Sequence, residues 1–125
     1  MTSETATLST VETIERFNEV FNTHDVDAIM ALMTDDVAFE NTIPTPDGER
    51  FEGQAAVRAF WERLFRSSPS ARFETEELFA AGDRCLVRWV YHWTGKDGQP
   101  GHIRGVDVFR VRDGKVAEKL SYVKG

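Results

Sequence analysis

Asp107 is the residue whose type and position point most directly to chemistry. The alternation of side chains over residues 102–112 predicts a strand that carries Asp107 on its apolar face. The other members of that face are Ile103, Gly105, Phe109 and Val111. A carboxyl group inside an apolar interior is either ionised and paired or kept protonated by desolvation. The protonated form could donate a hydrogen bond to a ligand oxygen, whereas the structural alternative is a carboxylate held by backbone N–H groups or by an arginine.

A second polar candidate and a group of aromatic residues could complete such a site. Asn41 follows a short predicted strand and precedes a proline-rich segment, so its amide could orient a water or a substrate carbonyl, or simply begin a turn. Four aromatic side chains could line a pocket or fill the core: Trp61, Trp89, Tyr91 and Trp93.

The histidines and the single cysteine are expected to have structural roles. His24, His92 and His102 fall in a turn, on a charged strand face and at a strand start, where surface structure is the expected role. Cys85 has no evident reactive partner and is expected to pack as a small hydrophobic residue. The sequence contains no glycine-rich phosphate loop, no serine nucleophile elbow and no metal-ligand spacing, so we expect no cofactor and no metal.

Composition narrows the classes of partner. The chain has 125 residues, with 15 Lys plus Arg against 21 Asp plus Glu, which gives a net charge of −6. This charge argues against nucleic acid or an anionic membrane as the main partner. A single cysteine forms no internal disulfide, and neither a secretory signal nor a membrane-spanning run is evident. We therefore expect one cytoplasmic domain over residues 1–125, with a core from about 9 to 123.

The elements that must position these side chains can be read from periodicity. Ser9 and Glu12 have capping-box spacing and predict a first helix that begins near Ser9. Asp25 can cap a second helix that continues to Met33. Three further segments follow: a strand over 37–41, a loop over 42–53 and a third helix that carries Val57, Phe60, Trp61, Leu64 and Phe65.

The second half predicts four antiparallel strands joined by turns. Their expected ranges are 72–80, 84–95, 102–112 and 115–123. Three helices followed by a meander predict an α+β domain with the helices packed on one face of a strongly curved, mainly antiparallel sheet.

Several segments together resemble a known superfamily. They are Glu15-Arg16-Phe17, Asn22 to Asp27, Ala31 to Asp36, Phe39-Glu40-Asn41, Phe51-Glu52-Gly53 before Val57 to Trp61, and Gly105 to Phe109 before Asp113 to Val116. From Val11 to Val123 the chain resembles the SnoaL-like and ketosteroid-isomerase-like branch of the nuclear-transport-factor-two-like superfamily. The resemblance implies a cystatin-like α+β barrel around a conical apolar pocket, and a homodimer formed through the outer sheet face.

The resemblance also assigns roles to single positions. Asp107 matches an aspartic acid that, with a tyrosine, forms the steroid isomerase oxyanion hole, and Phe17 stands at the tyrosine position. Asn41 stands at the position of the isomerase base and resembles the water-positioning asparagine of limonene epoxide hydrolase. Ser121 occupies the position of a last-strand aspartate in the hydrolase and in SnoaL-type cyclases. The hydrolase's second-strand Arg and Asp would fall near Arg88, Val90 and His92.

These observations predict a domain that binds an apolar, steroid-, polyketide- or terpenoid-like molecule. If it is an enzyme, it is expected to be a cofactor-independent isomerase, cyclase or epoxide-hydrolase-like enzyme with Asp107 and Asn41 as catalytic residues. The expected substrate-binding residues are Phe17, Trp61, Trp89, Tyr91, Phe109 and Ser121. The alternatives are a binding module that has lost the catalytic acids, or a homodimerisation module whose interior is filled.

Overall fold

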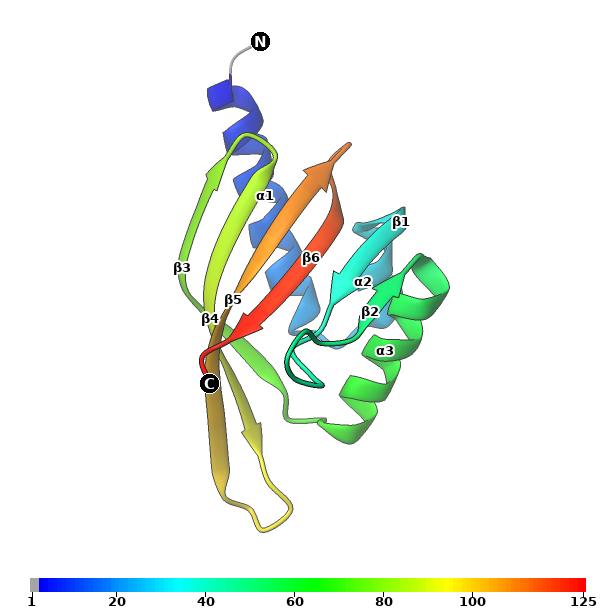
Figure 1. Ribbon diagram of the computed structural model, residues 1–125, viewed down its shortest axis with the longest axis vertical. Helices are drawn as coiled ribbons and strands as arrows, with labels where there is room; N and C mark the ends of the chain where they lie inside the picture. The colour runs from blue at the N-terminus through cyan, green and yellow to red at the C-terminus, as the bar shows by residue number, and fades with distance from the viewer. Residues whose placement is uncertain (1–2) are drawn as a thin grey trace.

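The computed structural model describes residues 3–125 and contains three helices packed against one face of a six-stranded sheet (Figure 1). The helices are α1 (Ser3–Phe21), α2 (Val26–Ala31) and α3 (Gln54–Ser67). The strands are β1 (Met33–Glu40), β2 (Arg50–Glu52), β3 (Arg72–Ala81), β4 (Arg84–Thr94), β5 (Pro100–Arg112) and β6 (Lys115–Val123). The α+β prediction is confirmed. No helix of the described residues has the length and apolar character needed to cross a membrane.

The sheet has the strand order β2-β1-β6-β5-β4-β3, and its neighbours pair antiparallel except for β1 and β6, which are parallel. Strands β2 and β3 are its two edges, so the sheet is open and does not close into a barrel. The last strand, β6, therefore lies inside the sheet. The long β4–β5 hairpin extends beyond the other strands (Figure 1).

Helix α1 begins at Ser3, so the prediction of a cap at Ser9 is wrong. Ser9 lies inside the helix, where its carbonyl oxygen accepts a hydrogen bond from the Thr13 hydroxyl at 2.9 Å. The first turns of the helix are held by a tertiary contact with the β3–β4 turn. The Gly82 N–H donates to Thr7 Oγ1 at 2.8 Å, and Thr10 Oγ1 donates to the Gly82 carbonyl at 2.7 Å. This long-range contact is invisible to a local capping pattern.

The segment between α2 and α3 also differs from its prediction. Helix α2 ends at Ala31 and β1 begins at Met33, because Met33 pairs with Val116 of β6 before a bulge that carries Asp35 and Asp36. Residues 50–52 form β2 on the edge beside β1, so they do not belong to the predicted loop. What remains of that loop folds back tightly: a Cβ at Gly48 would lie 1.8 Å from the Asn41 carbonyl oxygen.

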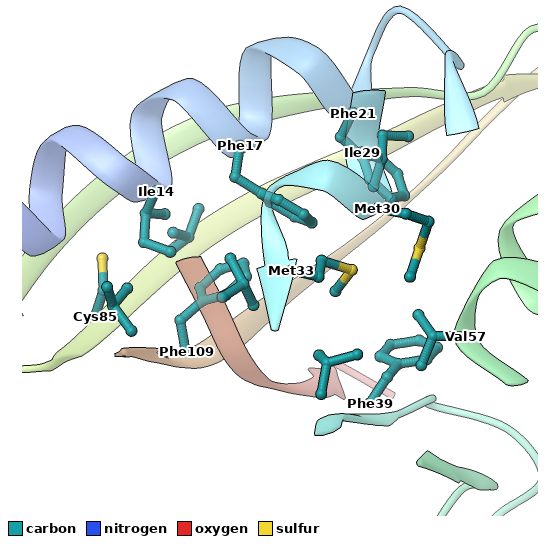
Figure 2. Packing of buried hydrophobic residues seen from close by; sticks show 14 of the residues in the cluster. Ile14, Phe17, Phe21, Ile29, Met30, Met33, Phe39, Val57, Cys85 and Phe109 are labelled. Atoms are coloured by element: carbon teal, nitrogen blue, oxygen red, sulfur yellow. The ribbon is translucent and has the colours of Figure 1, made fainter. Parts of the chain in front are cut away.

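The core lies between α1 and the inner face of the sheet and continues toward α3 (Figure 2). Ile14 and Phe17 of α1 pack there with Cys85 and Phe109 of the sheet, and the rings of Phe17 and Phe109 meet edge-on at 5.8 Å. Gln54 connects α3 to the end of α2 and the start of β1, where its amide donates to the carbonyl oxygens of Met30, Met33 and Thr34 at 3.0–3.2 Å. These contacts fix the sheet under the helices and leave space at the α3 end.

Candidate functional site

A cavity of about 380 Å³ opens between α3 and the inner face of the sheet. Most of its wall is apolar or aromatic: Phe21, Phe39, Ile43, Phe60, Trp61, Leu64, Phe73, Trp89, Tyr91, Trp93, Ile103 and Val123. The polar side chains on the wall are Asn41, Thr42, Ser68, Lys119 and Ser121. This volume and this lining are typical of a small-molecule site.

Strands β4 and β5 build the aromatic wall by placing large residues opposite small ones. Trp89 pairs with Gly105, and Trp93 pairs with Gly101. A Cβ at Gly105 would lie 2.5 Å from Trp89 Cη2, and a Cβ at Gly101 would lie 2.6 Å from Trp93 Cε2. The two indoles therefore occupy the space that the glycines leave free, so that both rings lie against β5.

Lys119 of β6 is the only charged residue among the described residues that line this cavity. Its side chain is 8% exposed, and Nζ lies 3.2 Å from Asp107 Oδ2 and 3.2 Å from Ser121 Oγ. The same nitrogen lies over three aromatic rings, 4.9 Å from the Phe39 centroid, 5.4 Å from the Trp61 centroid and 5.8 Å from the Phe21 centroid. The ammonium group is thus held by one carboxylate, one hydroxyl and ring faces.

Asp107 lies behind Lys119 and Ser121 as seen from the cavity. The pairing of β5 with β6 places Ser121 opposite Asp107, and the Ser121 hydroxyl donates to Asp107 Oδ1 at 2.6 Å. Asp107 is 5% exposed and lines a separate void of about 20 Å³, which it shares with Lys119, Phe17 and Thr75. Asp107 therefore lies beside a lysine and a serine hydroxyl, where the structural alternative expected backbone N–H groups or an arginine.

The other predicted site residues fall into two groups. Asn41, Trp61, Trp89, Tyr91 and Ser121 all line the cavity, so the structure brings them together. Phe17 and Phe109 are fully buried in the core and do not line it, although Phe17 reaches the small void.

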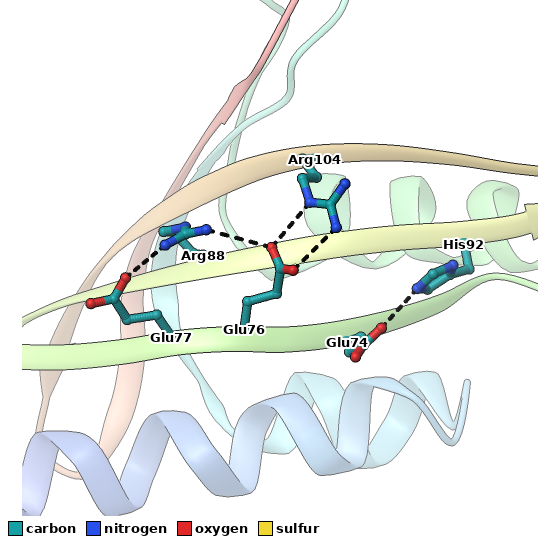
Figure 3. A network of polar contacts seen from close by, with 6 residues as sticks. All are labelled: Glu74, Glu76, Glu77, Arg88, His92 and Arg104. Carbon is teal, nitrogen blue, oxygen red and sulfur yellow. Dashed lines mark hydrogen bonds and ion pairs between the residues drawn. The ribbon is translucent and has the colours of Figure 1, made fainter.

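Residues near the predicted second-strand positions lie on the opposite side of the sheet. Figure 3 shows Arg88 with Glu76 and Glu77, and His92 with Glu74, in a network across β3, β4 and β5. Arg88 is 54% exposed, and the network is fully on the outer face, away from the cavity. Neither Arg88 nor His92 can contact a molecule inside it.

His24 and Cys85 have structural surroundings. His24 Nε2 lies 2.7 Å from the Ala71 carbonyl oxygen, and the imidazole stacks on the Phe65 ring at 4.1 Å. Cys85 is buried in the core, and burial, with a smaller contribution from Glu15, raises the pKa of its thiol to about 11. A thiol in this state is neither a nucleophile nor a metal ligand near neutral pH. Within the described part of the chain, no three His, Cys, Asp or Glu side chains come together as a metal site.

Lys119 is the site residue that the sequence analysis missed. The signal was present, because side chains two positions apart on a strand share a face and Lys119 stands two positions before Ser121. Lysine is rarely buried without a partner, so a buried Lys119 is predictable only when Asp107 on the neighbouring strand is considered together with it.

Comparisons with known proteins agree with this architecture. The SnoaL-like domain profile matches residues 14–119. An NTF2-like protein of unknown function from Mesorhizobium loti is 41% identical, with a TM-score of 0.80 over 95% of this chain and 93% of that one. A protein from Xanthomonas campestris pv. campestris proposed to be a polyketide cyclase is 26% identical, with a TM-score of 0.76 over 95% and 93% of the two chains.

TerC, crystallised with polyporic acid, is 21% identical, with a TM-score of 0.79 over 93% of this chain and 91% of that one, and so shares the fold. No curated protein matches the chain. The sheet topology, the three helices packed on its inner face and the profile match lead to one conclusion: the chain belongs to the SnoaL-like domain family, with the NTF2-like α+β fold.

Proposed function

We propose that this protein binds a largely apolar small molecule with at least one oxygen function in the cavity beneath α3. The observation that carries the proposal is an aromatic cavity of about 380 Å³ in which Lys119, the one charged residue among the described residues of its lining, lies beside ring faces. Aromatic walls favour a ligand with flat apolar surfaces, and Lys119 and Asn41 offer hydrogen-bond donors to its oxygen atoms. Steroid-, polyketide- and terpenoid-like molecules fit this description. One protein of the same fold, TerC, was crystallised with a small molecule, polyporic acid.

The test is a binding screen in which tryptophan fluorescence and thermal stability report on the cavity. The panel contains a steroid, an aromatic hydroxyquinone such as polyporic acid, and a terpenoid epoxide. Ile103→Trp fills the cavity from its β5 wall and is expected to abolish binding. Phe79→Trp, on the opposite sheet face and 54% exposed, is the matched control and should bind as the wild type does. Equal binding by both variants would place the ligand elsewhere and contradict the proposal.

A second function, cofactor-independent proton transfer, is favoured by one contact. Ser121 lines the cavity and donates to Asp107 Oδ1 at 2.6 Å, so it connects a bound molecule with a buried carboxylate. In this reaction Ser121 Oγ takes a proton from a carbon beside a ligand carbonyl, while its own proton passes to Asp107. Lys119 stabilises the oxygen on which negative charge develops.

Deuterium exchange separates this reaction from binding alone. An enolisable ketone that binds is incubated with the protein in deuterium oxide, and mass spectrometry follows the incorporation of deuterium. Ser121→Ala and Asp107→Asn should each slow the incorporation about 100-fold or more. A ligand that binds but shows no catalysed exchange would identify the protein as a non-catalytic binding module.

The proposal includes a homodimer formed through the outer sheet face. Phe79, Leu86, Val108 and Leu120 pair in register across β3, β4, β5 and β6 and form one apolar row. Phe79 is the most exposed member of this row. The charged network of Figure 3 lies on the same sheet face. In a twofold dimer each copy uses the same surface, so acidic residues of one network would face basic residues of the other.

A further inference from the structure

The Lys119 ammonium group has one N–H donor without a hydrogen-bonding partner among the described residues, and this donor bears on the charge of the ligand. An ammonium group carries three N–H donors, and the described residues supply it with two hydrogen-bonding partners, Asp107 Oδ2 and Ser121 Oγ. Its other neighbours are the ring faces of Phe21, Phe39 and Trp61, at 4.9–5.8 Å. One strong donor in an apolar wall is therefore left for a ligand.

The positions of Lys119 and Asp107 make the cavity wall positively charged. Lys119 lines both the cavity and the small void behind it, whereas Asp107 lines the void alone. A molecule in the cavity therefore lies closer to the cation than to the carboxylate. Ser121 adds no hydroxyl donor, because its proton is already given to Asp107. No carboxylate or imidazole is found among the described residues that line the cavity, and Tyr91 is the only other titratable group there.

We infer that the cavity selects the ionised form of an acidic hydroxyl group, so that the ligand class is a phenol, a hydroxyquinone or an enolised 1,3-dicarbonyl compound bound as its anion to Lys119. This inference rests on the proposed binding function and specifies its ligand. A phenolate or enolate oxygen accepts the third N–H of Lys119 as a charge-assisted hydrogen bond. The aromatic wall binds the remainder of the molecule, over which the negative charge is delocalised.

The experiment uses 4-nitrophenol, whose phenolate absorbs at a longer wavelength than the phenol, and its methyl ether, 4-nitroanisole, which cannot ionise. Binding of each is measured by equilibrium dialysis over a range of pH, and the absorbance of the bound nitrophenol reports its ionisation. In the wild-type protein the pKa of bound nitrophenol should fall by about 1 unit, because a cation within hydrogen-bond distance favours the phenolate. This measurement needs no variant and is unaffected by loss of folding in a mutant.

Two variants then separate the charge from the shape of the site. Lys119→Met keeps an unbranched side chain that ends one atom earlier and removes the charge, so the shift should disappear and the affinity for nitrophenolate should fall about 10-fold, while nitroanisole binds as before. Asp107→Asn removes the carboxylate that holds the Lys119 ammonium group in place, so it should also weaken nitrophenolate binding while nitroanisole binds as before. If the Asp107–Lys119 pair had only a structural role, both variants would bind nitrophenolate and nitroanisole more weakly.

The outcomes distinguish the two levels of the proposal. Nitrophenol bound with an unshifted or raised pKa would overturn the selection of an anion and leave small-molecule binding intact. Unchanged nitrophenolate affinity in a folded Lys119→Met protein would overturn the assignment to Lys119. If neither probe binds and no member of the wider panel binds, the proposed function itself is overturned, and the inference falls with it.

Discussion

Trp89 and Gly105 lie opposite each other on β4 and β5, and the Trp89 ring occupies the space that a side chain at position 105 would need. The cavity wall therefore depends on the absence of a side chain as much as on the presence of an indole. Gly101 and Trp93 repeat this relationship four residues away, nearer to the hairpin tip. The two pairs differ in what surrounds them, which leads to the first prediction.

Gly105→Ala should be more damaging than Gly101→Ala. A Cβ at position 105 would lie 2.3 Å from the Tyr122 carbonyl oxygen as well as 2.5 Å from Trp89, and a backbone atom inside a sheet cannot move away cheaply. The three atoms nearest to a Cβ at position 101 all belong to the ring of Trp93, which is half-buried and can turn outward. We expect Gly105→Ala to lower the free energy of unfolding by about 1–3 kcal/mol, measured by urea denaturation. Equal stabilities of the two variants would contradict this interpretation.

The Asp107–Lys119 pair should show strong coupling in a double-mutant cycle. Each side chain is at most 8% exposed, so Asp107→Asn or Lys119→Met alone leaves a buried polar group without its partner and should cost about 3–5 kcal/mol. The double variant should cost clearly less than the sum of the two. The exposed pair Arg58–Asp27 is the control, where Arg58→Met should cost at most about 1 kcal/mol. Additive costs at positions 107 and 119 would show that the two charges do not interact.

The Cys85 thiol should be unreactive in the folded protein. Burial raises the pKa of this thiol to about 11, so hardly any thiolate forms at pH 8. Ellman's reagent should react only after denaturation. Rapid modification of the native protein at pH 8 would contradict the assigned burial.

The same shift of the Cys85 pKa predicts a dependence of stability on pH. Between the ordinary pKa of a thiol, 9.0, and the pKa of about 11 in the folded protein, Cys85 loses its proton in the unfolded chain and keeps it in the folded chain. The folded state then binds more protons, and the free energy of unfolding falls as the pH rises toward about 11. Cys85→Ala should show a smaller decline over this interval in urea denaturation. The comparison of Cys85→Ala with the wild-type protein isolates the contribution of the thiol.

The apolar row on the outer face can be tested through the state of assembly. Phe79→Glu places a charge in the row at its most exposed member and should convert a dimer into a monomer in light-scattering measurements. Phe79→Leu keeps the apolar character and should remain dimeric. Ligand binding should persist in both variants because Phe79 does not line the cavity. A wild-type protein that is monomeric at high concentration would contradict the proposed interface.

Much of the fold followed from local patterns, because its elements have a clear period. The apolar spacing that includes Val57, Trp61 and Leu64 predicts α3, and alternation with turn residues predicts the strands of the second half. The elements whose observed bounds differ from the predicted ones depend on contacts with residues far away in the sequence. The extra turns of α1 rest on Gly82, and the early start of β1 rests on Val116, neither of which belongs to the local sequence.

The sequence predicts which sheet face carries the candidate site, but not which polar side chain of that face reaches the cavity. Alternation places Asp107 on the inner face, and the structure agrees. Which polar group reaches the cavity depends on the register between β5 and β6, where Ser121 pairs with Asp107 and Lys119 with Phe109. That register brings a longer side chain, Lys119, in front of the carboxylate, and no single-strand pattern contains this information.

The position of β6 between β1 and β5 has a consequence for the order of folding. Lys119 and Ser121 belong to β6, which follows all the other strands along the chain and yet lies inside the sheet. During synthesis, β1 and β5 each expose an unpaired edge until β6 arrives between them, and the pairing of β1 with β6, which joins segments far apart in sequence, forms slowly. The polar end of the cavity is therefore assembled in the same step that completes the sheet, so a nascent chain holds no part-built version of it.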